Sequence, residues 1–239
     1  MEQVAEGVYR LGSKWVNFYL VEESGGLTLI DAGFLGYVPT AMAAIRELGR
    51  SPSDVKAIVL THTHVDHIGG ADRLTKATGA PVFTHVGEAK IATGDEKSVG
   101  AKGLVPNLWR PTLWSFLGHA IANKGGAKVT VPNVTGFEGD EVLEVPGTPR
   151  VIYAPGHSIA HSALLLEDRR VLFSGDAMAT LAVHTGETGP MVHPFNRDRP
   201  AAIGSLDVLE KVDADLLLPG HGEPWRGSVS EAVSQARRR

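Results

Sequence analysis

Residues 61–70 read THTHVDHIGG and place three histidines and one aspartate within six consecutive positions: His62, His64, Asp66 and His67. The apolar run KAIVL comes directly before this stretch and predicts a buried strand, and a Gly-Gly pair closes it. We therefore expect these four side chains on a loop at the end of a strand, which is where functional side chains are commonly mounted.

The spacing within this stretch indicates metal ligation. Side chains two positions apart in an extended segment lie on the same side, so His62, His64 and Asp66 can converge on one region. His67 must point away from this region, which requires a local bend before the Gly-Gly pair. The stretch then offers two sets of ligands, which suggests two adjacent metal ions. Neutral imidazole and carboxylate oxygen suit zinc, iron or manganese.

Three further positions repeat one pattern: an apolar run, a small residue and then a potential ligand. His157 follows RVIYAPG, Asp176 follows RVLFSG, and His221 follows DLLLPG. Any one of them alone would be read as a surface or turn residue. Together with the cluster they predict a metal cage of seven ligands at strand ends that meet at one edge of a sheet.

The other five histidines lack this pattern. We interpret His85 and His161 as structural residues or as partners of ligands, and His119 as part of an insertion. His184 and His193 flank TGETGPMV, which we predict to be a flexible loop that reaches a substrate pocket.

Composition is that of an ordinary globular protein. The chain has 239 residues, of which 43% are hydrophobic and 21% charged. The formal net charge of −4, without a basic stripe, argues against a nucleic-acid partner. Cysteine is absent, which excludes disulfides, thiolate metal ligands and cysteine nucleophiles.

The start of the chain, MEQVAEGVYR, is acidic and is followed by no apolar segment of the kind found in signal peptides. No stretch approaches the roughly 18 apolar residues that span a bilayer. We therefore expect a cytoplasmic protein that acts on a small molecule and has no membrane partner; the sequence does not reveal its oligomeric state.

Predicted strands and helices alternate along the chain. We expect strands in VYRLGS, VNFYLV, LTLID, KAIVL, APVFTH and DLLLP and near residues 127–131, 141–145, 150–154, 162–167 and 170–173, with helices in VPTAMAAIRELG, over 71–78, near 200–211 and after the capping pattern Ser228-x-x-Glu231. This alternation predicts an α/β fold, and the lack of a linker predicts one domain over residues 1–239.

Residues at about 95–125 interrupt the alternation. The segment NLWRPTLWSFLGHAIANKGG predicts a helical insertion that covers the active site. Trp109, Trp114 and Phe116 are candidates for an apolar substrate pocket. Packing of these aromatic rings on the core is the alternative.

The motif His-x-His-x-Asp-His at residues 62–67 resembles that of the metallo-β-lactamase-fold metallohydrolase superfamily, and the later ligands follow in the same order. The resemblance runs from VNFYLV and LIDAG to PGHGEP, nearly the whole chain. It implies a four-layer αβ/βα sandwich of two mixed β-sheets flanked by helices. It also implies that His62, His64 and His157 hold one metal, that Asp66, His67 and His221 hold the other, and that Asp176 bridges both.

The residue at position 176 indicates the branch of this family. The main β-lactamase branch carries a cysteine at this position. The aspartate of this chain makes it similar instead to the branch of enzymes that hydrolyse lactones, thioesters and phosphodiesters. Quorum-signal lactonases often carry a tyrosine soon after this aspartate, where this chain has Ala177-Met178-Ala179. We also find neither the basic glutathione-binding region nor the added C-terminal helices of glyoxalase-II-like thioesterases.

The resemblance implies a dinuclear hydrolase of a carboxylic ester, lactone or thioester. Two divalent ions, zinc first and iron or manganese next, would lower the pKa of a bound water from near 16 towards about 7. The resulting metal-bound hydroxide would attack the substrate carbonyl, with Asp66 orienting it and moving its proton.

Other functions stay open at this point. Persulfide dioxygenases are similar in fold to this superfamily but use a single iron, held by residues matching His62, His157 and Asp176. Phosphodiester or ribonucleic-acid cleavage is disfavoured by the acidic charge balance. A β-lactam hydrolase and a metal-binding protein without activity complete the alternatives.

Overall fold

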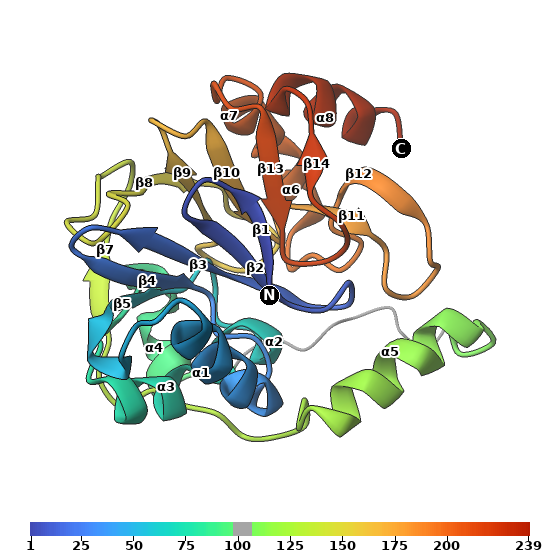
Figure 1. The fold of residues 1–239 in the computed structure, drawn as a ribbon. Helices are drawn as coiled ribbons and strands as arrows, with labels where there is room; N and C mark the ends of the chain where they lie inside the picture. The colour runs from blue at the N-terminus through green and yellow to red at the C-terminus, as the bar shows by residue number, and fades with distance from the viewer. Residues whose placement is uncertain (98–106) are drawn as a thin grey trace.

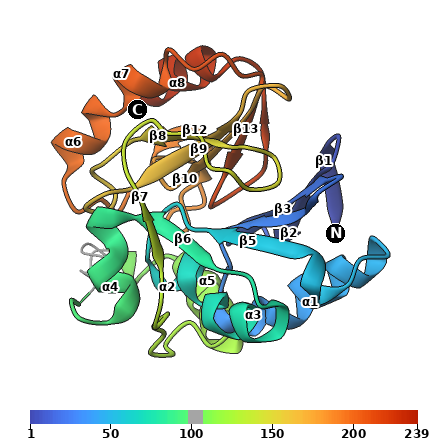
Figure 2. The ribbon, with the colours of Figure 1, turned by 90° about the vertical axis from the view of Figure 1, so that its left-hand side faces the viewer.

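Two β-sheets face each other in the computed structural model of this chain, which describes residues 1–97 and 107–239 (Figures 1 and 2). Helices cover the outer face of each sheet, so the molecule has four layers. The four-layer α/β sandwich predicted from the sequence is confirmed.

Within the described residues the first sheet has seven strands in sequence order: β1 (Glu2–Ala5), β2 (Val8–Gly12), β3 (Asn17–Glu23), β4 (Gly26–Ile30), β5 (Val55–Val59), β6 (Val82–His85) and β7 (Thr135–Phe137). Strands β1 to β4 pair antiparallel, whereas β4 to β7 are parallel. The carboxyl ends of β4, β5 and β6 therefore meet at one edge. This edge carries the histidine cluster, because His62 follows β5.

The second sheet has five strands in the described residues, in the order β14 (Trp225–Arg226), β13 (Leu216–Pro219), β10 (Val171–Gly175), β9 (Ser162–Leu166) and β8 (Arg150–Tyr153). Strands β10 and β13 are parallel, and Gly175 pairs with Pro219. Asp176 and His221, which come just after these residues, therefore leave the sheet side by side. A separate hairpin is formed by β11 (Met178–Leu181) and β12 (Thr188–Val192).

The helices are α1 (Val38–Glu47), α2 (Val65–Ile68), α3 (Ala71–Thr78), α4 (Ala89–Thr93), α5 (Pro111–Ala122), α6 (Arg199–Gly204), α7 (Leu206–Leu209) and α8 (Val229–Arg237). In α1 the buried residues Ala41, Ala44 and Ile45 form one stripe that packs on the first sheet. Ser228 caps the start of helix α8, and its hydroxyl accepts the N–H of Glu231, as the capping pattern predicted. None of the described helices is long and apolar enough to cross a membrane.

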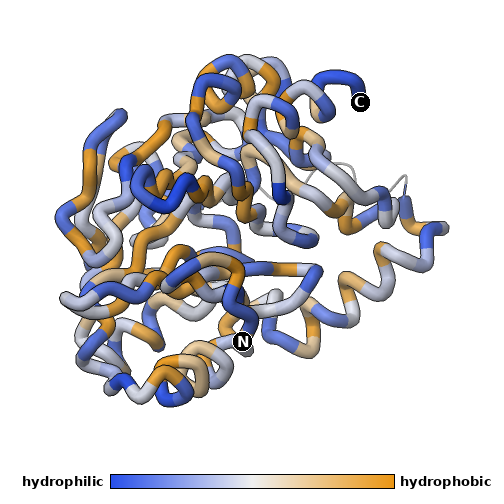
Figure 3. Tube along the Cα trace, turned by 45° about the horizontal axis from the view of Figure 1, so that its top comes forward, coloured by the Kyte–Doolittle hydropathy of each residue, from blue (hydrophilic) through white to orange (hydrophobic). Residues whose placement is uncertain are grey.

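The core lies in three layers, because successive side chains of a strand point to opposite faces. On β4, Leu29 packs towards the outer helices and Ile30 towards the other sheet. On β10, Leu172 packs towards α8 while Phe173 faces the first sheet, where its ring contacts Tyr19. Figure 3 shows hydrophobic residues recurring along the strands of both sheets and a hydrophilic C-terminal end.

Some predicted elements are wrong. Residues 127–131 and 141–145 form no strand, although Val142 makes an isolated bridge to Arg150. The predicted helix near 200–211 is divided into α6 and α7, which meet at Ser205. The segment TGETGPMV is not a flexible loop, since most of it belongs to the hairpin strand β12.

Residues 98–106 of the predicted insertion at about 95–125 lie outside the described residues. Its described part contains α5, which stands apart from the other helices in Figure 1. Phe116 on this helix contacts Trp15, which lies between β2 and β3 of the first sheet, with 6.0 Å between the ring centroids.

Candidate metal centre

The predicted ligands come from the carboxyl ends of strands in both sheets. His62, His64, Asp66 and His67 follow β5 of the first sheet, whereas His157, Asp176 and His221 follow β8, β10 and β13 of the second. The expectation that all strand ends belong to one sheet is therefore corrected. The cluster lies where edges of the two facing sheets come together.

A change of backbone conformation gives the cluster its two directions. His64 is extended, with φ −68° and ψ 152°, and it directly precedes the short helix α2. Asp66 and His67 lie in the first turn of this helix, where the N–H of His67 donates to the carbonyl of His64 at 2.9 Å. The predicted bend before Gly69 is this helical turn.

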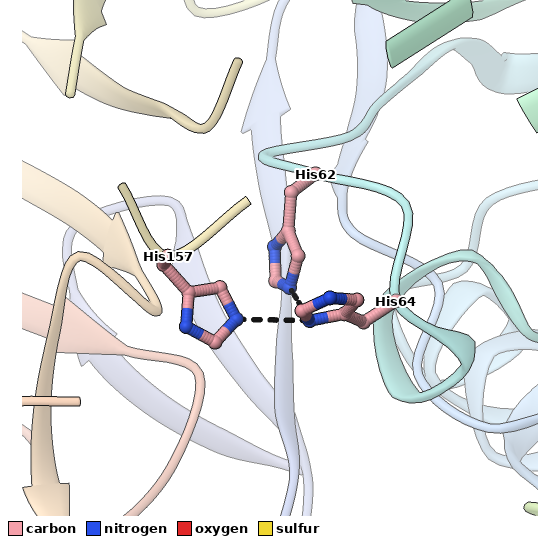
Figure 4. Close-up of side chains that lie close together, drawn as sticks. All are labelled: His62, His64 and His157. Carbon is pink, nitrogen blue, oxygen red and sulfur yellow. Dashed lines mark hydrogen bonds between the residues drawn. The ribbon is translucent and has the colours of Figure 1, made fainter. Parts of the chain in front are cut away.

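Three imidazoles form the first group of donors (Figure 4). The Nε2 atoms of His62 and His157 lie 3.0 and 2.9 Å from Nδ1 of His64. Their ligand atoms lie within 4.8 Å of one another, close enough to surround one ion. This is the set that the resemblance assigned to the first metal.

Asp66, His67 and His221 form the second group, also with ligand atoms within 4.8 Å. Nε2 of His221 lies 3.5 Å from Oδ2 of Asp66. The other ring nitrogen of His221 is hydrogen-bonded to the carbonyl of Trp15, which orients the ring towards the cluster.

Asp176 lies between the two groups. Its Oδ1 is 3.4 Å from Nε2 of His67, and its Oδ2 is 3.3 Å from Nε2 of His157 and 3.1 Å from Nε2 of His221. One carboxylate thus faces donors of both groups, as a ligand that bridges two ions must.

The donors fit a bound metal. Nε2 of His67 and Oδ1 of Asp176 are buried, and neither has a hydrogen-bond partner among the described residues. A buried polar atom without a partner costs about 1–3 kcal/mol, so a cation between these atoms would satisfy both. The imidazole and carboxylate donors, with no thiolate, suit zinc, iron or manganese.

Gly220 makes the close approach of these donors possible. A Cβ atom at this position would lie 2.2 Å from Oδ1 of Asp176 and 2.6 Å from Cε1 of His67. Any side chain here would push apart two residues of the cluster.

The charges of the cluster are strongly coupled. Burial lowers the pKa of His62 and of His157 well below 6.5, and neighbouring histidines act in the same direction. Burial would also lower the pKa of His67, but the carboxylates of Asp176 and Asp31 raise it well above 6.5. Burial opposes ionisation of Asp176, yet the surrounding histidines, first His221, hold the pKa of its carboxyl well below its usual range. Asp176 is therefore a carboxylate in the metal-free protein.

Asp31 and Glu88 support the ligands, and the sequence interpretation missed both. Asp31 follows β4 and accepts hydrogen bonds from Nδ1 of His67 at 2.8 Å and from the N–H of Thr61 at 2.8 Å. Glu88 is fully buried and accepts from the hydroxyl of Thr63 and from the N–H of Ala160. Asp31 carried a usable signal, since it too follows an apolar strand; Glu88 carried none.

A cavity of about 970 Å³ opens above the cluster. Its floor contains His64, Asp66, His157, Asp176, His193 and His221. Its wall is mainly apolar and includes Phe34, Val65, Ile68, Phe116, Leu117 and Phe195. The cavity gives a small molecule direct access to the donors.

The structure brings only some of the predicted pocket residues to this cavity. Phe116 and His193 line it. Trp109 and Trp114 do not; they are 74% and 57% exposed, and the indole N–H of Trp114 donates to the carbonyl of Leu108. His184 does not line it either, because its ring packs on Phe195.

The remaining histidines have structural contacts. Nε2 of His161 accepts the backbone N–H of Asp176 at 3.0 Å, so it is a partner of a ligand, as predicted. His85 stacks on Tyr153, and His119 is hydrogen-bonded to the hydroxyl of Tyr37 at 2.5 Å.

Comparison with known proteins agrees with this geometry. The family model for the metallo-beta-lactamase superfamily matches residues 16–221, which include all seven predicted ligands. The probable metallo-hydrolase YflN of Bacillus subtilis is 29% identical over 94% of this chain and 87% of its own length. The N-acyl homoserine lactonase AttM of Rhizobium radiobacter is 27% identical over 88% of this chain and 83% of its own length.

A solved structure has the same fold. The metallo-beta-lactamase family protein TTHA1429 of Thermus thermophilus superposes with a TM-score of 0.68 and 29% identity, over 98% of this chain and 79% of that chain.

Proposed function

The chain belongs to the metallo-β-lactamase superfamily and is a metal-dependent hydrolase, and we propose that it uses two zinc ions to hydrolyse a carboxylic ester, lactone or thioester. One observation carries the proposal: seven imidazole and carboxylate donors converge, and five of them, His64, Asp66, His157, Asp176 and His221, line the floor of a cavity large enough for a small molecule. Such a floor exposes the donors to the substrate on one side only.

In this proposal His62, His64 and His157 hold one ion, Asp66, His67 and His221 hold the other, and Asp176 contacts both. When bound, such ions lower the pKa of water and polarise a carbonyl oxygen. The residues of the chain then have to orient the reactants, exclude bulk water and move one proton.

Asp66 is placed to move this proton. Its side chain is 16% exposed, lines the cavity, and lies at the boundary between the buried donors and the substrate space. Its Oδ2 faces His221, and in this proposal the carboxylate accepts a proton from the attacking water and passes it to the leaving atom.

The cavity wall supports a substrate with an apolar acyl part. Phe116 and Leu117 of α5 line the cavity together with Val65 and Ile68, so an acyl chain would find apolar contacts there. A polar head group would find Asn196 and Arg197 at the same cavity.

The similarity to the lactonase AttM supports the choice of a carbon-centred ester. A small-molecule partner follows from the apolar cavity wall, and the acidic chain gives no support to a nucleic-acid partner. A cytoplasmic location is part of the same proposal and rests on composition.

Initial rates of the zinc-reconstituted protein on a panel of lactones, p-nitrophenyl esters and thioesters test the proposal. We expect turnover of at least one class, and a loss of about 10²- to 10⁴-fold in Asp66→Asn, because proton transfer contributes roughly this factor. Asp72→Asn on α3 is the matched control, since this residue only pairs with Lys76 on the surface and its substitution leaves the rate unchanged.

Loaded protein that hydrolyses none of these classes above a zinc-only blank would contradict the proposal. Oxygen uptake with a persulfide by iron-loaded protein would in that case assign the site to the dioxygenase branch.

A further inference from the structure

His193 lies inside the cluster although it belongs to neither group of donors described above. It follows the apolar end of β12 and is 4% exposed. Its ring centroid lies 4.5 Å from that of His157 and 5.2 Å from that of His221. It therefore follows the end of a hairpin strand, much as His157, Asp176 and His221 follow strands of the second sheet.

The two ring nitrogens of His193 have different surroundings. Nδ1 lies 3.0 Å from the carbonyl oxygen of Phe195, to which it donates when it carries the ring proton, and 3.3 Å from the backbone nitrogen of Phe195, whose N–H it accepts when it does not. In the tautomer with the proton on Nδ1, which is the one that can bind a metal here, Nε2 carries a lone pair. It is buried and has no hydrogen-bond partner among the described residues.

The lone pair of Nε2 faces other electron-rich atoms. Nε2 lies 3.5 Å from Oδ2 of Asp176, and the ligand atoms of His157, Asp176 and His193 all lie within 4.8 Å of one another. Two donors at about 2.1 Å from a tetrahedral zinc ion are roughly 3.4 Å apart. The observed spacing is thus that of two ligands of one ion, and a cation would remove the repulsion between them.

His193 also has the orientation of the other ligands. In His67 and His221, as in His193, Nδ1 is held by an oxygen of the chain and Nε2 points to Asp176. Metal-binding histidines are commonly held in this way.

We propose that Nε2 of His193 is an eighth donor of the metal centre, beside His157 and Asp176. The inference rests on the proposed function only in that the chain binds metal. It replaces the earlier interpretation of His193 as a residue that contacts substrate from a flexible loop.

His193→Asn is the variant that tests this donor. The amide of asparagine can still donate to the carbonyl of Phe195 but offers nothing at the position of Nε2. His184→Asn is the matched control. His184 also neighbours Phe195, with 4.9 Å between the ring centroids, but it takes part in none of the donor groups.

Two readouts are independent of activity: zinc affinity by competition with a chromophoric chelator, and the visible spectrum of the cobalt(II)-substituted protein. We expect His193→Asn to bind zinc at least about tenfold more weakly, since loss of even an outer partner of a ligand costs 10- to 100-fold. Its cobalt bands should change in intensity as one donor is lost, while His184→Asn matches the wild type. Melting of the metal-free proteins checks that both variants fold; if His193→Asn does not, His193→Gln takes its place.

Wild-type zinc affinity and cobalt spectrum in the folded variant would overturn the inference, whatever the activity. A wild-type protein that binds no metal would overturn the proposed function as well, so the two failures are distinguishable.

Discussion

Nδ1 of His67 and Oδ2 of Asp31 lie 2.8 Å apart, although 36 positions separate the two residues in the chain. Both side chains are buried, and each follows a strand of the parallel part of the first sheet, β5 and β4. The sheet therefore holds the ring of a ligand through a neighbouring strand end. Asp31 itself adopts a left-handed conformation, with φ 61°, which aspartate tolerates better than most residues.

Replacing Asp31 with Asn tests this support. The amide is uncharged and can turn a donor towards Nδ1 of His67, so the ring loses its fixed orientation. We expect zinc affinity to fall about 10- to 100-fold, measured by chelator competition. Asp54→Asn, at a capping position before β5 and thus at the opposite end of this strand from the donors, should bind zinc like the wild type; equal affinity in Asp31→Asn would show that the hydrogen bond does not matter for binding.

Gly220→Ala should separate two donors without removing either. The new methyl group would lie 2.2 Å from Oδ1 of Asp176, so the carboxylate or the backbone must move. We expect loss of tightly bound metal and a fall of about 1–3 kcal/mol in the free energy of unfolding of the metal-free protein.

Gly118→Ala is the control for this substitution. Gly118 lies inside α5, where an added Cβ meets nothing within 4 Å. Alanine should stabilise the helix by about 0.5–1 kcal/mol and leave metal content unchanged. Full metal occupancy in Gly220→Ala would contradict the close packing described for the cluster.

The metal-free protein should lose stability below neutral pH because of His161. Burial lowers the pKa of this residue to about 4, whereas an unfolded histidine titrates near 6.5. The unfolded state therefore binds the proton first as the pH falls from about 6.5 towards 4, and stability decreases. His161 should account for about 2 kcal/mol between pH 7 and pH 5.

Urea unfolding of the wild type and of His161→Gln at both pH values measures this contribution. Glutamine can accept the N–H of Asp176 but does not titrate. The pH dependence should be smaller in the variant by about 2 kcal/mol; an identical dependence would mean that folding does not change the pKa of His161.

Phe116 and Trp114 lie on the same helix but should differ in function. Phe116 lines the cavity, while Trp114 is exposed and does not. Phe116→Ala should raise KM for acyl substrates with long chains by roughly tenfold, because apolar contact in the pocket is lost. Trp114→Ala should leave the chain-length series unchanged, and the opposite result would place the tryptophan at the substrate.

The candidate ligands could be picked out from the sequence because the cluster follows the buried strand β5 and each of the three later residues follows a buried strand of its own. Apolar runs such as VLFSG and LLLPG are local signals, and the residue after them is fixed by the end of the strand. The sequence did not indicate that β5 and β10 belong to different sheets, since sheet assignment depends on contacts between distant segments.

His193, Glu88 and the exposed tryptophans could not be placed from the sequence. The strand before His193 is short and follows a segment rich in glycine and threonine, which looks like a loop until β12 pairs with β11. Residues 127–131 have the composition of a strand, but several of them line the cavity instead of joining a sheet. In each case tertiary contacts override the local preference.

The dinuclear site is tested by the metal content per chain, measured by elemental analysis on protein purified without a chelator or a metal-affinity tag. We expect about two equivalents of zinc, iron or manganese per chain, and a large loss of both ions in Asp176→Ala, since this carboxylate faces both donor groups. One equivalent of iron per chain would contradict the dinuclear site and favour the dioxygenase. No metal after reconstitution would contradict the catalytic account altogether.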